Sequence, residues 1–263
     1  MSRIVYVNGD YLPEEQAMIS VFDRGFLFAD GVYEVSSVLR GKLVDNQGHL
    51  TRLHRSLGEL DMAAPASDAE IAAIQNALIE KNAVEEGLVY LQVTRGAADR
   101  DFAYPEGVKP SLVMFTQQKN VVDSPQARRG IAIVSVEDIR WRRRDIKTVG
   151  LLAPCMAKMA AKGAGADDAW LVEDGYVTEG SSNNAYIINS EGVLVTRQLG
   201  NEILAGSTRR AVLKLAREQR IAIEERPFSI AEASHASEAF ITSATTFVMP
   251  VVCIDGNPVA DGR

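Results

Sequence analysis

The sequence predicts an α/β (α+β) protein of two lobes, and three observations lead to this fold class. Short strand-like runs rich in Val, Ile and Leu alternate with longer segments whose apolar residues recur every three or four positions. This mixture occurs in both halves of the chain, which favours two packed lobes with a cleft between them. A polar stretch of weak periodicity separates the halves. We therefore predict a small N-terminal domain at 1–118, a linker at 119–129 and a larger C-terminal domain at 130–263.

Strands and two helices are predicted in the N-terminal domain. Leucines at helical spacing indicate a helix at about 49–60. A second helix is predicted to begin at Ser67, because Ser67-Asp68-Ala69-Glu70 fits a capping box, in which the Ser and Glu side chains satisfy backbone N–H groups of the first turn. The strands expected around these helices are residues 4–8, 88–95 and 112–116.

Helices and short strands also alternate in the C-terminal domain. A helix is predicted at 207–219, where Val212, Leu213 and Leu215 are apolar, and another at 151–162. Ser229-Ile230-Ala231-Glu232 fits a second capping box. The strands expected here are residues 131–136, 169–172, 185–188, 193–196, 221–225 and 239–242.

Composition argues against several classes of protein. The 263 residues carry a net charge of −7, whereas a nucleic-acid binder needs a basic face. No apolar run approaches the ~20 residues of a membrane helix, and the N-terminus predicts a strand and a turn instead of a signal peptide. Cys155 and Cys253 lie far apart in apolar runs, which predicts reduced, buried thiols and no metal spacing. We therefore predict a cytoplasmic protein that binds no metal, membrane or nucleic acid.

A lysine, a carboxylate and an anion-binding turn follow one another in the order that a pyridoxal 5'-phosphate (PLP) enzyme requires. PLP is an aldehyde that a lysine amine holds as an imine, and Lys147 can supply the amine. A carboxylate beside the pyridine nitrogen favours its protonated state, in which the ring accepts electrons, and Glu179 can supply it. The phosphate needs N–H groups and hydroxyls at a helix start, which Gly206-Ser207-Thr208 offers.

Taken alone, each of these features has an ordinary structural explanation. Most lysines are solvated surface residues, Glu-Gly-Ser-Ser runs commonly make polar turns, and Gly-Ser-Thr runs commonly cap helices. Likewise, an arginine can simply pair with a surface acid, as Arg52 with Glu59. The arginine-rich run at 140–144 suggests a nucleic-acid patch, but Trp141 interrupts it and Asp145 follows it. The combination and order of the motifs favour the PLP enzyme.

With these residues identified, the chain resembles the class IV (fold-type IV) PLP-dependent aminotransferases over nearly its whole length, and among them the D-amino-acid aminotransferases most closely. The resemblance implies their two-domain fold, with the active site in the interdomain cleft and the PLP lysine in the C-terminal domain. It rests on Asp23-Arg24-Gly25, Phe28-Ala29-Asp30-Gly31-Val32-Tyr33-Glu34, His49-Leu50-Thr51-Arg52-Leu53, Leu91-Gln92-Val93-Thr94-Arg95-Gly96, Glu137-Asp138-Ile139-Arg140, Asp145-Ile146-Lys147 and Thr178-Glu179-Gly180-Ser181.

Position in these motifs implies a role for each cofactor-binding residue. Lys147 resembles the Schiff-base lysine and proton shuttle, and Glu179 resembles the partner of the pyridine nitrogen. Leu204 is expected to pack on the cofactor ring. The residues expected at the phosphate are Arg52, Gly206, Ser207 and Thr208.

The substrate residues are implied by the same resemblance. Tyr33 and Arg100 match positions that capture the substrate carboxylate, and the loop with Arg100 tends to come from the partner subunit, which implies a homodimer with shared active sites. Relatives with this specificity usually carry arginine-x-histidine in that loop, whereas this chain has Phe102, and Asp99 and Asp101 flank the arginine. Phe102 removes a polar contact and makes the pocket edge more apolar.

Two other positions depart from the pattern. Ala244 stands where a phosphate-binding threonine is common, so Ser243 or Thr245 is expected to take its place. Relatives also continue into a final helix beyond the position of Arg263, so that an incomplete C-terminus is one reading of the sequence.

The function implied is transfer of an amino group from a D-amino acid, with D-alanine expected, to a 2-keto acid, with 2-oxoglutarate expected, through a Schiff base at Lys147. A branched-chain L-amino-acid or (R)-amine transaminase is the alternative that the apolar Phe102 keeps open, and an aminodeoxychorismate lyase shares the scaffold and the lysine. A PLP-carrying binding protein is the non-enzymatic alternative. A requirement for a keto acid separates the transaminases from the lyase, and the donor used separates the transaminases from one another.

Overall fold

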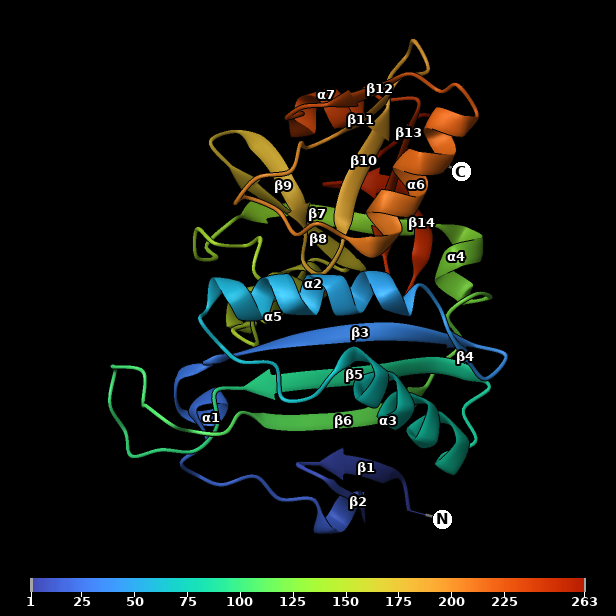
Figure 1. Cartoon of the computed structure of the whole chain (residues 1–263). Coiled ribbons are helices and arrows are strands. Elements are labelled where there is room, and N and C mark those ends of the chain that lie inside the picture. Colours follow the sequence, from blue (N-terminus) through green and yellow to red (C-terminus); the bar gives the residue numbers. More distant parts are fainter. Residues whose placement is uncertain (1, 263) are drawn as a thin grey trace. The chain divides into compact units, whose positions relative to one another are not determined.

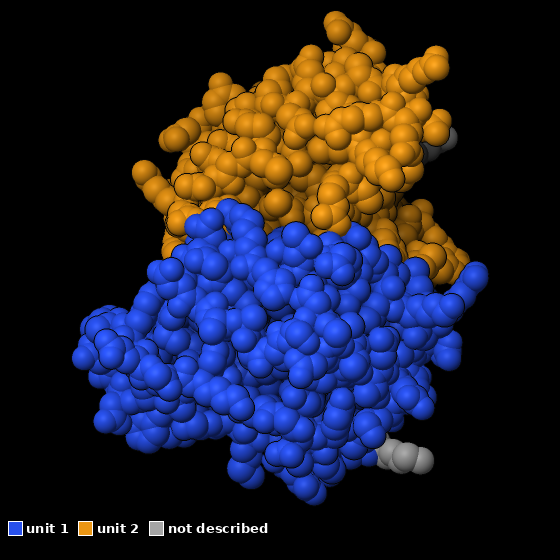
Figure 2. Space-filling view, viewed as in Figure 1, with its two compact units in different colours: residues 1–121, 146–150 blue, residues 122–145, 151–263 orange. Residues whose placement is uncertain are grey.

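The computed structural model describes residues 2–262, which form two compact units. The first unit consists of residues 2–121 with Ile146–Gly150, and the second of Val122–Asp145 with residues 151–262 (Figure 2). The division along the chain differs from the predicted one, because the segment with Lys147 packs with the first unit and the residues predicted as a linker are divided between the two units. Thr148 pairs with Val32, and the N–H of Tyr33 donates to the carbonyl of Lys147 at 3.0 Å.

An antiparallel sheet with the strand order β2-β1-β6-β5-β3-β4 forms the first unit (Figure 1). β3 and β5 pair along their whole lengths, from Gly31 opposite Thr94 to Leu39 opposite Glu86. The strands are β1 (Ile4–Val7), β2 (Asp10–Pro13), β3 (Gly31–Leu39), β4 (Lys42–Leu43), β5 (Glu86–Thr94) and β6 (Ser111–Gln118).

Two helices pack on one face of this sheet, α2 (Asn46–Glu59) and α3 (Asp68–Lys81), while η1 (Glu14–Gln16) and α1 (Arg24–Phe28) are single turns. The predicted capping box is confirmed, since Ser67 and Glu70 exchange both of its hydrogen bonds. Residues at helical spacing on α2 and at alternate positions on the strands make one buried apolar layer. This layer consists mainly of Val32, Leu50, Leu53, Leu57, Ile71, Leu78, Leu91, Val93, Leu112 and Met114.

Three aromatic side chains on the opposite face of the same sheet are only half-buried. Tyr33, Tyr90 and Phe115 form a row across β3, β5 and β6, with ring centroids 5.6 and 4.7 Å apart. Tyr33 therefore lies on the face of the sheet that α2 and α3 do not cover.

The second unit has a mixed sheet, with the strand order β12-β11-β10-β13-β14-β7-β8-β9 and β15 beside β14 (Figure 1). β7 pairs in parallel with both β14 and β8. Its core surrounds Trp170 and Phe228, whose rings meet edge to face at 5.7 Å. The elements are α4 (Pro125–Arg129), β7 (Ile131–Glu137), α5 (Leu152–Gly163), β8 (Asp168–Glu173), β9 (Tyr176–Gly180), β10 (Asn184–Ile188), β11 (Leu194–Thr196), α6 (Ser207–Glu218), β12 (Ile223–Glu225), α7 (Ile230–Ser234), β13 (Glu238–Ser243), β14 (Phe247–Ile254) and β15 (Asn257–Pro258).

Several sequence-based expectations differ from this structure. The predicted linker contains α4, which Ser124 caps. Ser229 accepts the hydrogen bond of a capping box, but Glu232 turns its carboxylate to Arg226 instead of returning one. The thiols were predicted to be buried, but Cys155 is exposed because α5 places it on its outer face, and Cys253 is only partly buried. None of the helices within residues 2–262 has the length and apolarity needed to cross a membrane.

Candidate active site

Lys147 lies against Tyr33 in the first unit. Because the segment at 146–150 pairs with β3, the side chains of Lys147 and Tyr33 project to the same side, and the lysine Nζ is 4.0 Å from the centroid of the tyrosine ring. The backbone N–H of Lys147 donates to the Ser56 hydroxyl of α2 at 3.3 Å. The lysine backbone is thus fixed on both sides, while its amine lies beside a half-buried aromatic ring.

The other face of β3 carries a buried carboxylate, Glu34, close to the same lysine. Arg52 of α2 donates to it from Nε at 2.8 Å and from Nη2 at 2.7 Å, and the ring of His49 is 2.8 Å away. Burial raises the pKa of Glu34, but the charge and hydrogen bonds of Arg52, the hydrogen bond of His49 and the charge of Lys147 outweigh it and lower the pKa to about 2. The structure thus pairs Arg52 with Glu34; Glu59 instead lies near Arg55.

Replacing Glu34 with Gln should lower the free energy of unfolding by about 3 kcal/mol at pH 7, because the ordinary carboxyl pKa of 4.5 falls to about 2 in the folded protein. A carboxylate whose pKa is lower in the folded protein stabilises the fold fully when the pH is above its pKa in the unfolded chain. This stabilisation is lost as the pH falls through its pKa in the folded protein. The difference between wild type and variant should therefore shrink between pH 4.5 and 2. Urea unfolding at a series of pH values measures it.

Glu59→Gln is the matched control, since Glu59 pairs with an arginine of the same helix at 3.6 Å but is partly exposed. Exposed pairs of this kind contribute about 0.3–0.5 kcal/mol. A difference between wild type and Glu34→Gln that stays constant with pH would contradict the assigned charge of Glu34.

Glu179 is buried at the end of β9 in the second unit, where three groups donate to its carboxylate. Nη1 of Arg140 is 2.5 Å from Oε1, while the amide of Asn184 and the backbone N–H of Leu204 are 3.0 and 3.1 Å from Oε2. Burial raises the pKa of Glu179 above its ordinary value, although the charge and hydrogen bond of Arg140 oppose part of this rise. Glu179 is consequently a fixed, desolvated carboxylate next to a single guanidinium.

Arg140 is itself fixed by a second carboxylate, Asp138. Its Nε and Nη2 donate to Asp138 at 2.9 and 2.7 Å, and the hydroxyl of Thr178 donates to the same carboxylate at 2.7 Å. Asp138 and Arg140 belong to the motif at 137–140, so the structure connects that motif with the one that contains Glu179.

The start of α6 lies next to Glu179. Asn184 donates to Glu179 and to the carbonyl of Leu204, which holds the turn at 204–206 beside β9 and β10. Gly206 leaves no room for a side chain, because a Cβ would lie 2.2 Å from Oδ1 of Asn184. Gly206 is also the N-cap of α6, and no side chain in the described chain caps this helix. Ser207 and Thr208 thus begin a helix whose first N–H groups suit an anion.

Ser243 and Thr245 lie at the turn after β13. Asn184 pairs with Thr242 across β10 and β13, so this turn begins at the same end of the sheet as the start of α6. The Ser243 hydroxyl bonds to those of Thr245 and Thr246, at 3.3 and 2.8 Å. Ser243 and Thr245, the two residues expected to take the place of a threonine at position 244, are therefore hydrogen-bonded to each other. Thr246 is bonded to the same Ser243 hydroxyl.

Arg100 and Phe102 lie on the connection between β5 and β6, which extends beyond the sheet near α1 (Figure 1). Both side chains are exposed, Phe102 to 78%. Arg100 lies above the rings of Phe28 and Phe102, at 5.2 and 5.4 Å, and these rings are 5.6 Å apart. Phe102 therefore provides an apolar support for Arg100, at the position where the sequence resemblance led us to expect a histidine.

Sequence reasoning missed the side chains that hold the predicted residues. Glu34 and Arg140 lay inside motifs that were recognised but were given no role, and His49 was given none. Asn184 and Thr246 had no signal of their own, because their importance comes only from contacts made by the fold.

The donors in each unit fit the chemical needs of PLP. The first unit supplies an amine with a fixed backbone, and the second supplies a buried carboxylate beside a helix start that has room for no side chain at Gly206. Hydroxyls of Ser207, Thr208 and Ser243 are the complementary donors for a phosphate. The roles of the individual residues remain predictions.

Comparisons with known proteins agree with this chemistry. The family model for amino-transferase class IV matches residues 31–254. A D-alanine aminotransferase of Staphylococcus aureus strain MSSA476 is 37% identical over 262 residues, which cover 98% of this chain and 92% of the relative. A D-alanine aminotransferase of Bacillus licheniformis is 36% identical over 258 residues, or 98% of this chain and 90% of the relative.

Solved structures of lower sequence identity share the fold. A branched-chain amino acid aminotransferase of Escherichia coli superposes with a TM-score of 0.91 at 22% identity, covering 100% of this chain and 90% of the other. Another branched-chain amino acid aminotransferase, solved with pyridoxamine 5'-phosphate, gives 0.90 at 22% identity, covering 100% and 89%. These likenesses confirm the predicted fold class.

Proposed function

The chain belongs to the class IV aminotransferases, a PLP-dependent family, and on this premise we propose that it transfers the amino group of D-alanine to 2-oxoglutarate. The observation that carries the choice of D-alanine is 36–37% identity to D-alanine aminotransferases over 98% of the chain. The branched-chain structures match at only 22% identity, so they support the fold and not the substrate.

Lys147 is proposed to bind the cofactor covalently and to move the proton. When bound, PLP supplies an aldehyde carbon that takes up the amino group and a ring that accepts the electron pair left on the substrate. Nζ of Lys147 removes the proton from Cα of the amino acid and returns it at the C4′ carbon of the cofactor. The pairing of its backbone with β3 keeps this amine in one place.

Glu179 is proposed to hold a proton on the pyridine nitrogen. Its ionised form does so best, and Arg140 favours that form although burial opposes it. The start of α6 at Ser207 and Thr208, the hydroxyls of Ser243 and Thr245, and Arg52 are proposed to bind the phosphate, with Leu204 against the ring.

Tyr33 and Arg100 are proposed to bind the substrate carboxylate. Tyr33 is beside Lys147, which supports a role close to the reacting carbon. Arg100 is exposed on the long connection between β5 and β6, so it suits a carboxylate that arrives from outside the first unit. Phe102 under the guanidinium replaces a polar contact with an apolar one.

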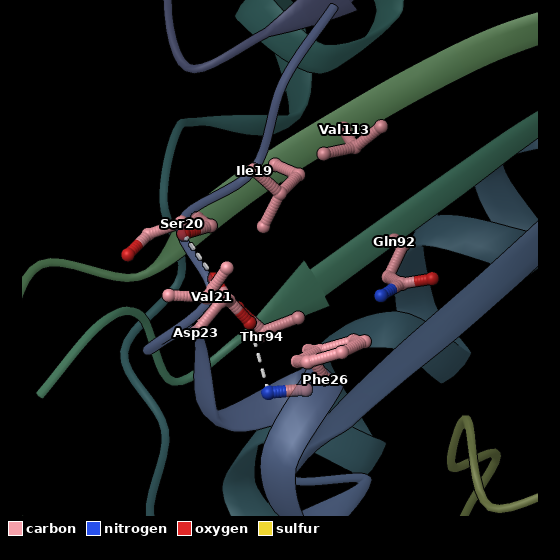
Figure 3. A pocket seen from close by; sticks show the side chains of 10 residues that line it. Ile19, Ser20, Val21, Asp23, Phe26, Gln92, Thr94 and Val113 are labelled. Carbon is pink, nitrogen blue, oxygen red and sulfur yellow. Dashed lines mark hydrogen bonds between the residues drawn. The ribbon is translucent and has the colours of Figure 1, made fainter.

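A homodimer is proposed on the basis of the uncovered sheet face of the first unit. Exposed apolar side chains border this face, among them Val21 and Phe26. Together with Gln92 and Val113, the segment at 19–26 lines a pocket of ≈ 300 Å³ (Figure 3). An apolar area of this kind is typical of an interface, and a second copy is the partner that the family resemblance implies. A monomeric mass in sedimentation equilibrium would contradict it. The cytoplasmic location stays a prediction.

The proposed substrate can be tested by adding D-alanine and L-leucine, separately, to the purified PLP-loaded protein. D-alanine alone should remove the visible absorbance of the bound cofactor within one half-reaction, and 2-oxoglutarate should restore it. Stopped-flow absorbance measures both steps.

Each other outcome points to one alternative. A loss of absorbance with L-leucine alone would replace the proposal by a branched-chain transaminase. A product from D-alanine without any need for a keto acid would favour the lyase. No change with either donor, but a change with an (R)-amine, would favour an amine transaminase; salt-sensitive nucleic-acid binding without any amino transfer would favour a binding protein.

A further inference from the structure

A buried carboxylate between two arginines lies at one end of the first unit. One oxygen of Asp30, Oδ2, accepts from Nε of Arg24 and from Nε of Arg95, each at 2.8 Å. All three side chains are at most 8% exposed. Backbone hydrogen bonds join the same residues, from Asp30 to Arg24 at 3.2 Å and from Arg95 to Asp30 at 3.1 Å. None of the roles proposed above uses this cluster.

Both arginines also contact the loop at 97–110, which carries Arg100. Nη1 of Arg24 donates to the carbonyl of Asp101, the residue that follows Arg100, at 2.6 Å. The guanidinium of Arg95 lies 3.5 Å from the centroid of the Tyr104 ring, and that of Arg24 lies 4.6 Å from the ring of Phe28. Phe28 is also one of the two rings beneath Arg100.

The two ends of the loop are held together at Gly96. This residue has φ +99°, and a Cβ there would lie 2.2 Å from the carbonyl oxygen of Lys109. Asp23 also holds the two ends of the loop together, because its carboxylate accepts hydrogen bonds from Thr94 at 2.9 Å and from Ser111 at 2.8 Å. These contacts therefore fix the two ends of the loop, and Arg24 and Arg95 determine the path of its outer part.

We propose that Asp30 is a positioning residue that, through Arg24 and Arg95, clamps the 97–110 loop in the one conformation that presents Arg100 to the substrate carboxylate. The clamp rests on contacts alone, whereas the role of Arg100 rests on the proposed function. Asp30 orients both guanidiniums because it takes the Nε–H of each. Nη1 of Arg24 then donates to the Asp101 carbonyl. Nη1 and Nη2 of Arg95 donate to the carbonyls of Asp61 and Leu60, at 3.2 and 2.7 Å, which leaves the face of its guanidinium on the Tyr104 ring.

The geometry explains why a carboxylate is needed at residue 30. Two guanidiniums that share one buried site repel each other unless a negative charge lies between them. An aspartate can bridge them with a single oxygen, as observed. Without the bridge, the carbonyls of Leu60 and Asp61 would still bind Arg95, at 2.7 and 3.2 Å, but its Nε edge would lose its acceptor. The contact of its guanidinium with the exposed ring of Tyr104 would then weaken, and with it the outer attachment of the loop.

The test uses Tyr104 first, since this residue is 53% exposed and replacing it leaves the buried core intact. In the PLP-loaded Tyr104→Leu protein, backbone amides at 97–110 should exchange with deuterium about two- to thirtyfold faster, the range that a cation–π contact is worth. Tyr104→Phe keeps the ring and should exchange like wild type. Tyr11→Leu is the matched control, because Tyr11 also lies beside a cation, Lys81 at 5.2 Å, but away from this loop.

Steady-state kinetics with D-alanine then tests the presentation of Arg100. Tyr104→Leu should raise the KM for D-alanine by a similar factor, with kcat within about twofold, because binding of the carboxylate is weakened and the proton transfer is not. Asp30→Asn should increase both the exchange rate at 97–110 and the KM for D-alanine more than Tyr104→Leu does. If Asp30→Asn does not fold, the Tyr104 variants alone decide.

Unchanged exchange in Tyr104→Leu would overturn the clamp. Faster exchange with an unchanged KM would overturn the link from the clamp to Arg100, although the proposed function would stand. A wild-type protein that takes no amino group from D-alanine would instead sink the proposed function, and exchange, which needs no substrate, would still judge the clamp.

Discussion

Replacing Lys147 with alanine should lower the rate of amino transfer from D-alanine at least about 10⁴-fold, because both the covalent tie to PLP and the general base are lost. Loss of the proton transfer alone accounts for about 10²–10⁴. The visible absorbance of the loaded protein should change with it, and reduction with borohydride should no longer leave PLP attached to the peptide around 147. Turnover assays and peptide mass spectrometry measure the two effects.

Lys81→Ala is a stringent control for this experiment. Lys81 belongs to the same unit and also lies over a tyrosine ring, at 5.2 Å, but it is an exposed residue at the end of α3. Its loss should leave both turnover and PLP attachment close to wild type. Retained turnover in Lys147→Ala would remove the basis for assigning this residue and with it the proposed chemistry.

Much of the fold was predictable because its helices carry regular apolar spacing. The helices around Leu53 and Leu213 were predicted within a few residues of their observed bounds. Strand β3 was missed, since Glu34, Ser36 and Ser37 interrupt its apolar alternation. These polar side chains are buried, whereas a polar residue in a strand usually indicates an exposed position. Strand β14 was missed because it contains Pro250, which is rare in a central strand. The structure accommodates it beside a register shift at 251–253.

The site was predictable only where chemistry restricts the residue type. A lysine, a buried carboxylate and a glycine-led helix start have few substitutes in a PLP enzyme, so their order along the chain was informative. The groups that hold them have many substitutes. Nothing in the sequence around Glu34 shows that Arg52 and Lys147 surround it, because β3, α2 and the segment at 146–150 meet only in the folded unit.

Glu179→Gln is expected to have the second-largest effect on catalysis, a fall in kcat of about 10²–10³-fold, which is typical for removal of one preorganised electrostatic group. Glutamine keeps the shape and the bonds from Asn184 and Leu204, but it has no charge to hold a proton on the pyridine nitrogen. Stopped-flow absorbance of the D-alanine half-reaction measures it, with bound PLP quantified to show that the cofactor remains.

Glu173→Gln is the matched control, because Glu173 is bound by Arg144 at 2.8 and 2.9 Å in the adjoining network and has no contact with Glu179 in the described residues. Its kcat should stay within about threefold of wild type, since a residue outside the reacting groups rarely alters the barrier further. Equal kcat values for wild type and Glu179→Gln would refute the assignment of Glu179.

The pH dependence of kcat in an Arg140→Gln variant tests separately whether Arg140 keeps Glu179 ionised. Burial raises the pKa of Glu179, while the charge and hydrogen bond of Arg140 lower it. Without Arg140, burial and the charge of Asp138 still raise the pKa of Glu179, and the hydrogen bond from Leu204 is left to lower it, so this pKa should rise further. The ionised carboxylate is the active form, so activity should be lost at a higher pH than in wild type as the medium is acidified. An acid limb of the kcat profile that stays in place, or moves to lower pH, would show that Arg140 does not control the charge of Glu179.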